Sequence, residues 1–366
     1  SLGWPEGLPV RVVGLPLLLL AVPWVGPLGA MGALQLATTL GLILQGMIVG
    51  WVARQLGLEH RGALAASAAA ILAPLSIHVQ GIGQVENLAL GFLALCAYGG
   101  LKGGRLGWGC SVAGLLLSVF SSPYQAFSAG VLLLSTAAFR SWKALVKTLA
   151  MAITIAAIAV PYYLGAAQGS AAEGGASSSP PEQGHWASAG VSDLVWPRAV
   201  WFTDTLEMPG FSQRLAQISN QPKSASLVDF PWSTPHQVSY LGWVLIGLGL
   251  FGIWTLRNKP LGRALALAAA TCTLCAMGPE ARLFGEKLGG LPMPWALVED
   301  IPGIGQLAAT HRFLSGTVLA LVLGTGVVVS RLGKAGLVAV VAVLAIEGLL
   351  IAPVHWPLPT SVLIGP

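Results

Sequence analysis

Residues 36–58 read LATTLGLILQGMIVGWVARQLGL, and no charged residue interrupts this run before Arg54. A helix crosses the roughly 30 Å hydrocarbon core of a bilayer with about 20 mostly apolar residues, so the run is long enough to span it. It therefore predicts a transmembrane helix that ends in a basic surface turn.

The rest of the chain repeats this pattern. Only 9% of the 366 residues are charged and the mean hydropathy is +0.75, whereas an ordinary soluble domain has about 25% charged residues. A soluble globule is excluded. The apolar runs predict an all-α, polytopic transmembrane helix bundle of about ten spans, with outer-face loops and interfacial helices. The predicted spans are 29–53, 63–79, 86–101, 106–121, 124–139, 146–165, 237–256, 262–278, 313–330 and 336–353.

The basic residues predict which joints share a side of the membrane, because Lys and Arg collect in cytoplasmic loops. Twelve of the 19 Lys and Arg residues lie in alternate joints, at 54–61, 102–105, 140–147, 257–263 and 331–334. The joints HVQGIGQVEN and SSPYQ contain none and are expected to face outward. The net charge of +5 thus indicates topology and not nucleic-acid binding.

The spans divide the chain into five regions. These are an outer-face interfacial or half-inserted segment (1–28), a six-span region (29–165), an outer periplasmic loop region (166–236), a four-span region with an outer loop at 279–312 (237–353), and an outer tail that we expect to lead into a further domain (354–366). Prolines at 16, 23 and 27 argue against an eleventh span in the first region. The Gly- and Ser-rich stretch 168–184 is expected to be flexible.

One carboxylate lies inside a predicted span. Glu347 falls about 9 Å, or six residues of helical rise, from the outer end of the last span. A charge in hydrocarbon is costly, so we expect Glu347 to face the protein interior or an outward cavity. It either lines that cavity or forms a structural hydrogen bond to a neighbouring helix.

Two outward joints gather polar side chains that could contact an acceptor. The turn between the second and third spans contains His78, Gln84, Glu86 and Asn87, and the joint SSPYQ contains Tyr124 and Gln125. Glu86 lies at a predicted helix start, where a carboxylate also stabilises the helix by capping. Both interpretations, contact with an acceptor and capping, remain open for Glu86.

The outer loop 279–312 ends in His311 and Arg312, where the ninth span begins. A cation at a helix N-terminus opposes the helix dipole, and the positive-inside rule does not explain one on the outer face. An anion beside it would, since a guanidinium binds phosphate in a bidentate fork. The alternative is an Arg312 that extends to a lipid headgroup.

Several segments together resemble the GT-C superfamily of membrane glycosyltransferases, and in particular its bacterial YfhO-like group. In chain order they are WPEGLP (4–9), GQVEN (83–87), SSPYQ (121–125), VSDLVWP (191–197), YLGWVLIGLGLFGI (240–253) and LPMPWALVEDIPGIGQLAATHRF (291–313). Each motif is loose, but together they extend over nearly the whole chain.

The resemblance implies a multi-pass protein of the bacterial inner membrane with an outward active face. A sugar would pass there from a polyprenyl-phosphate donor to a cell-envelope acceptor, with an acid in the first outer loop as base. The expected Asp is missing, since the first aspartate is Asp193. Either the chain is a fragment that lacks the first span, or it is an inactive relative.

Inverting transfer needs a base and a cation beside the departing phosphate. Glu86, Glu6 and Glu347 are the candidate carboxylates, and Arg312 with His311 is the candidate phosphate site. No cofactor is predicted, and a divalent metal remains open. The alternatives are a transporter or flippase of lipid-linked glycans, and a membrane subunit without catalysis.

The topology predicts that cysteines placed at Ser178 and at Gly103 lie on opposite sides of the membrane. An impermeant thiol reagent added to intact cells should label the first position and spare the second. Equal labelling of the two positions would contradict the predicted sidedness.

Overall fold

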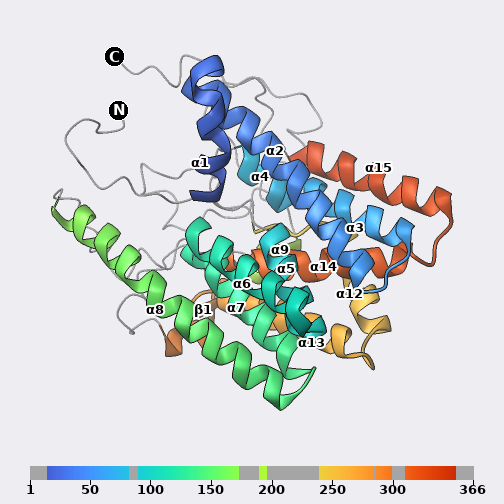
Figure 1. The fold of residues 1–366 in the computed structure, drawn as a ribbon. Coiled ribbons are helices and arrows are strands. Elements are labelled where there is room, and N and C mark those ends of the chain that lie inside the picture. Colours follow the sequence, from blue (N-terminus) through green and yellow to red (C-terminus); the bar gives the residue numbers. More distant parts are fainter. Residues whose placement is uncertain are drawn as a thin grey trace.

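The computed structural model describes residues 15–81, 90–172, 189–195, 239–283, 286–298 and 310–351. These residues are mostly helical, and their helices pack into one bundle with α8 and α15 at its periphery (Figure 1).

The described helices follow the predicted spans closely. In the first half they are α1 (Leu15–Ala21), α2 (Val25–Gln55), α3 (His60–Leu72), α4 (Pro74–Gly81), α5 (Leu90–Lys102), α6 (Gly104–Ser121), α7 (Pro123–Ala138) and α8 (Trp142–Ala172). In the second half they are α9 (Val191–Val195), α12 (Trp243–Thr255), α13 (Pro260–Ala276), α14 (Leu314–Val329) and α15 (Lys334–Ile351). Short 3-10 turns are η1 (Val22–Trp24), η4 (Pro294–Leu297) and η5 (Thr310–Phe313).

The helical fold class is confirmed, whereas the number of spans stays a prediction. By length and composition, three described segments could cross a membrane: Gly32–Gln55, Trp142–Ala159 and Thr310–Val329. Other apolar helices, such as α5, α12 and α13, have only 10–17 residues. The outer loop 279–312 adds an antiparallel hairpin of β1 (Glu280–Leu283) and β2 (Glu286–Pro292) to the expected helices.

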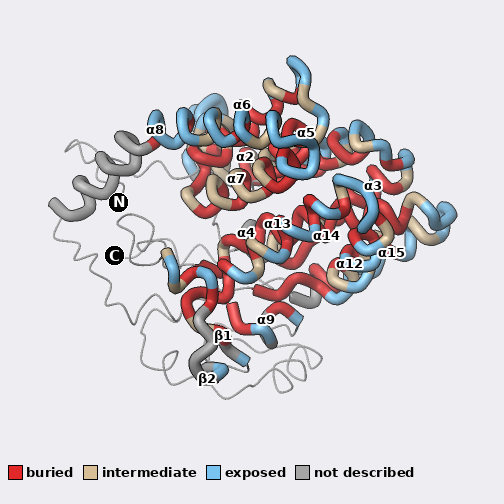
Figure 2. The backbone as a smooth tube through the Cα atoms, turned by 90° about the horizontal axis from the view of Figure 1, so that it is seen from below, coloured by how far each residue is buried: buried red, intermediate tan, exposed pale blue. Residues whose placement is uncertain are grey.

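Helix α14 is the centre of the bundle. All of its residues are buried, and Figure 2 shows it as a continuous buried segment among the other helices. It packs against α12, α3 and α13. A helix that is apolar on every side is buried either in a protein core or in a bilayer, and α14 is buried among the other helices.

Glycines allow these neighbours to approach closely. A Cβ on Gly252 of α12 would overlap the carbonyl oxygen of Gly324 in α14, and one on Gly249 would lie 2.7 Å from the carbonyl oxygen of Leu321. Gly62 of α3 similarly leaves no room for a Cβ beside Gly326 of α14. Small residues at helix contacts permit this close packing of backbones, as in membrane helix pairs.

The predicted span 63–79 is divided into α3 and α4 by Pro74. Proline has no N–H, so the carbonyl of Ala70 loses its helical donor. Gln45, buried in the middle of α2, donates from Nε2 to that carbonyl at 2.9 Å, and Ser76 Oγ donates to it at 2.9 Å. Gln45 Oε1 also accepts from the backbone N–H of Leu90 at 3.0 Å, which satisfies the start of α5.

Within the segment expected to be interfacial (1–28), the described residues begin with α1, which folds against α2. Leu17 and Ala21 of α1 form a small apolar cluster with Ala33 and Ala37 of α2. Helix α2 is kinked at Gly29, whose φ of 70° is accessible to glycine. Its predicted position, in the membrane interface or half-inserted and not spanning, remains a prediction.

The five basic joints lie at one end of the bundle. They contribute Glu59, Lys102, Arg140, Lys259 and Arg331 to the wall of a cavity of about 680 Å³. Their shared end agrees with their predicted shared side, and we call it the predicted inner end. The opposite end, where α14 begins, is the predicted outer end.

The glycine contacts predict a position-specific loss of stability. Gly252→Ala should lower the free energy of unfolding by about 1–3 kcal/mol, because the new methyl group overlaps α14. Gly247→Ala is the matched control on the same helix, since no atom lies within 4 Å of the place its new methyl group would take. Thermal unfolding in detergent measures both, and equal stability of the two variants would contradict the close α12–α14 contact.

The structure also corrects the choice of Gly103 for thiol labelling. Gly103 has a φ of 62°, and a Cβ there would overlap the guanidinium of Arg140. Gly333 is exposed, lies in another basic joint and has open space around it. Gly333→Cys should therefore resist the impermeant reagent on intact cells and react after lysis. The four native cysteines are buried, which limits background labelling.

Candidate functional site

Two of the predicted site segments meet at the predicted outer end. Ser122 caps α7 by accepting from the N–H of Tyr124 at 3.3 Å, which places Tyr124 and Gln125 in the first turn. The turn η5 places Arg312 beside them, with its guanidinium 5.2 Å from the centre of the Tyr124 ring. This is the geometry of a cation–π contact.

Aromatic side chains pack beside the Arg312–Tyr124 pair. Phe313, which follows Arg312, is completely buried, and its ring centre lies 5.5 Å from Tyr124, 4.5 Å from Phe127 and 4.9 Å from Trp295. These separations are typical of tilted aromatic contacts. The packing of Phe313 therefore limits where the adjacent Arg312 can lie.

Hydrogen bonds attach η5 to two helices. Thr310 Oγ1 donates to the carbonyl of Ala276 at 3.1 Å, at the end of α13. Ser128 of α7 donates to the carbonyl of Phe313 at 3.2 Å, and Ser315 donates to Ser128 at 3.2 Å.

His311 is 5% exposed and Gln125 is fully buried. We call Arg312 and Tyr124, with their chain neighbours His311 and Gln125, the Arg312 cluster.

Glu347 lies in a second cluster at the same end, at the start of α12. Its Oε1 accepts from the backbone N–H of Trp243 at 2.6 Å and from the hydroxyl of Tyr240. The side chain is only 6% exposed. The expectation that Glu347 faces the protein interior is confirmed, and the bond to a neighbouring helix is the structural alternative stated above.

The Glu347 contact has a clear stabilising role. The first N–H groups of a helix have no partner within the helix, and the helix dipole favours a negative charge there. Glu347 supplies both an acceptor and a carboxylate to α12, although it belongs to α15. It therefore joins the outer ends of these two helices.

The short segment 189–195 connects the two clusters. The N–H of Ala189 donates to the carbonyl of Ala276 at 2.9 Å, beside Thr310. At the other end of the segment, the carbonyl of Leu194 accepts from the N–H of Leu241 at 3.1 Å, and the carbonyl of Val195 accepts from the indole N–H of Trp243 at 2.8 Å.

The other predicted site residues cannot be placed. Glu6, Gln84, Glu86 and Asn87 lie outside the described residues, and of His78 only its backbone position in α4 is described. Within the described ranges, no three His, Cys, Asp or Glu side chains are close enough to hold a metal ion together.

Sequence reasoning missed Tyr240, Gln45 and the ring of Trp295. Tyr240 is the residue that binds Glu347, and its only signal was a polar ring directly before an apolar run. Gln45 was visible as a lone amide within LGLILQGMIVG, where a buried polar side chain needs a partner.

Comparisons of the chain with protein-family models, curated proteins and solved structures found no match.

Replacing Glu347 should separate its hydrogen-bonding role from its charge. Glu347→Leu removes the acceptor of the buried Tyr240 hydroxyl and of the Trp243 N–H, and it should lower the free energy of unfolding by about 1–3 kcal/mol. Glu347→Gln keeps an acceptor oxygen and should lose less. Glu59→Leu, an exposed carboxylate at the other end, is the control, and thermal unfolding in detergent is the measurement. Unchanged stability of Glu347→Leu would disprove the capping role.

Proposed function

We propose that this chain is a multi-pass membrane protein that binds a polyprenyl-phosphate-linked sugar at its outer face and acts as a GT-C-type glycosyltransferase of the bacterial inner membrane. The observation that carries the proposal is the position of Arg312, fixed by aromatic packing at the predicted outer end of the central helix.

Exposed apolar side chains around the bundle support the membrane environment. Met47, Leu19, Ile158, Phe251 and Val338 are each between 51% and 67% exposed, on five different helices. Soluble proteins rarely expose so many large apolar side chains together. Together with the three helices long enough to span a bilayer, they favour a chain surrounded by lipid.

Arg312 suits the donor phosphate chemically. A guanidinium can bind two phosphate oxygens at once and stabilise the negative charge that develops when the sugar departs. The contact with Tyr124 already restrains the Arg312 guanidinium, so this side chain loses less conformational entropy when it binds a phosphate. A polyprenyl chain would lie in the surrounding lipid, with its phosphate at the membrane surface where the Arg312 cluster is proposed to lie.

The carboxylate that would activate the acceptor is less well defined. Oε1 of Glu347 already accepts two hydrogen bonds at the start of α12, which favours a structural role for it. Glu86 and Glu6 remain the candidates for the base, and His78, Gln84 and Asn87 remain candidates for acceptor contacts.

A transporter is less well supported. A path for a lipid-linked glycan needs polar side chains through the depth of the bundle. The centre is instead filled by α14, of which all sixteen residues are buried. A membrane subunit without catalysis would share this architecture, and the binding experiment distinguishes it from an enzyme.

The proposed phosphate contact predicts a selective loss of donor binding. With the protein in detergent and undecaprenyl phosphate as the probe, Arg312→Ala should weaken binding about tenfold or more, because a charge-assisted contact is lost. Arg312→Lys should recover only part of the affinity, since it lacks the planar fork.

Arg257→Ala is the matched control for this experiment. Arg257 also stacks on an aromatic ring, 4.3 Å from the centre of Trp254, but at the predicted inner end. Its variant should bind the probe as the parent does. Parent-like binding by folded Arg312→Ala would overturn the phosphate site and favour a headgroup anchor or a subunit without catalysis.

A further inference from the structure

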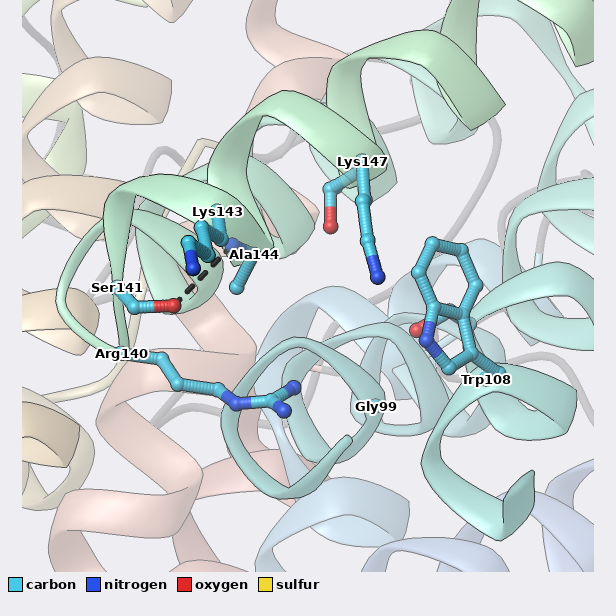
Figure 3. Close-up of a pocket in the computed structure, with 9 residues that line it drawn as sticks. Gly99, Trp108, Arg140, Ser141, Lys143, Ala144 and Lys147 are labelled. Carbon is cyan, nitrogen blue, oxygen red and sulfur yellow. Dashed lines mark hydrogen bonds between the residues drawn. The ribbon is translucent and has the colours of Figure 1, made fainter. Parts of the chain in front are cut away.

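A small polar cavity lies at the predicted inner end, between α5, α6 and the start of α8. It has a volume of about 130 Å³, enough for several water molecules and hence for a phosphate group. Its wall includes three cations, Arg140, Lys143 and Lys147, together with Trp108 and Ser141. Figure 3 shows Arg140 reaching toward Gly99 and Lys147 reaching toward the indole of Trp108.

Among the described residues, the three cations lack an acidic partner. No Asp or Glu oxygen of the described residues lies within 4.0 Å of the charged nitrogens of Arg140, Lys143 or Lys147. Lys143 also lies in the first turn of α8, where a positive charge opposes the helix dipole. Three repelling charges around one cavity would be stabilised by an anion inside it.

The backbone around Arg140 orients its side chain. Its guanidinium packs against Gly103, whose φ of 62° and missing Cβ leave room for it. Ser141 caps α8 by accepting from the N–H of Ala144 at 3.1 Å. These contacts restrain the joint that carries the cations. The positive-inside rule explains the sign of their charge but not their arrangement around a cavity.

Exposed apolar residues also lie on α8 and α6, but on other faces of these helices than the ones that line the cavity. Val146, Leu149 and Ile153 are 47%, 46% and 61% exposed along one side of α8, and Leu106 of α6 is 60% exposed. Trp142, at the start of α8, is 74% exposed, as is favoured for an indole at a membrane surface. A ligand with a phosphate and acyl chains would place its phosphate in the cavity and its chains in the lipid around α8 and α6.

We propose that the cavity binds the phosphate of an anionic phospholipid of the inner leaflet. Basic pockets between membrane helices on the cytoplasmic side recognise such headgroups. The bound lipid would bridge the α7–α8 joint and α6, and so stabilise the attachment of α8 to the bundle. This inference depends on the membrane placement proposed above, but not on donor binding or sugar transfer at Arg312.

The test measures binding to the full chain in neutral detergent by native mass spectrometry. Dioctanoyl phosphatidylglycerol is the probe, dioctanoyl phosphatidylcholine the zwitterionic comparison, and inorganic phosphate the free anion. We expect the anionic lipid to bind about tenfold more tightly than either, because only it has both a net charge and acyl chains.

Arg140→Gln/Lys147→Gln should abolish this preference, about a tenfold loss. Arg105→Gln/Lys334→Gln is the matched control, since it removes one Arg and one Lys from the same end but from outside both cavities. The control should keep the preference within about twofold.

Thermal unfolding without lipid shows whether each variant is folded. A second cavity variant, Lys143→Gln/Lys147→Gln, leaves the Gly103 contact of Arg140 intact and should lose the preference as well.

Three results would overturn the proposal. They are equal affinity for the two lipids, an equal loss in the control variant, and inorganic phosphate binding as tightly as phosphatidylglycerol, which would remove the lipid from the assignment. None of these results involves Arg312, so failure here is distinguishable from failure of the proposed donor site.

Discussion

The close contact of α14 with its neighbours is the constraint on which the rest of the bundle depends. Helix α14 contains no charged residue and most of its buried surface is apolar, so electrostatic attraction contributes little to holding the surrounding helices. In a lipid environment, dispersion and close packing must provide most of the association. The glycines at 62, 249, 252 and 324 let α3 and α12 approach near enough for this to occur.

Two buried polar side chains reveal a second constraint, because each forms a contact that joins separate elements. Gln45 connects α2 to the break between α3 and α4 and to the start of α5. Glu347 connects α15 to the start of α12. An unsatisfied backbone group in an apolar interior costs about 1–3 kcal/mol, so these contacts allow helices to be interrupted where the arrangement of the bundle requires it.

The two ends of the bundle differ in character, and this difference organises both proposals. At one end, aromatic rings pack beside Arg312, and a separate cluster holds Glu347, which caps α12. The other collects basic residues from five joints around cavities. The first arrangement would suit one oriented phosphate, whereas the second would suit the charged surface of a membrane leaflet.

The helices could be predicted from the sequence because apolar length and proline position are local properties. Each predicted span overlaps a described helix, although Pro74 divides one of them and the α12 helix begins only at Trp243. The charge of the joints similarly predicted which of them would meet at one end. The hairpin after α13 was not predicted, since strand pairing depends on contacts across a turn.

The candidate site could be predicted only in part. Arg312 and Tyr124 were visible as polar groups at predicted helix ends. Glu347 was visible as a carboxylate inside a predicted span, and its burial followed from the cost of a charge in hydrocarbon. Three further features depend on tertiary structure alone. Arg312 lies over Tyr124, Tyr240 binds Glu347, and Arg140 and Lys147 share a cavity with Trp108. A sequence determines which residues need partners through local polarity and length, but the identity of each partner depends on how helices distant in the chain pack around α14.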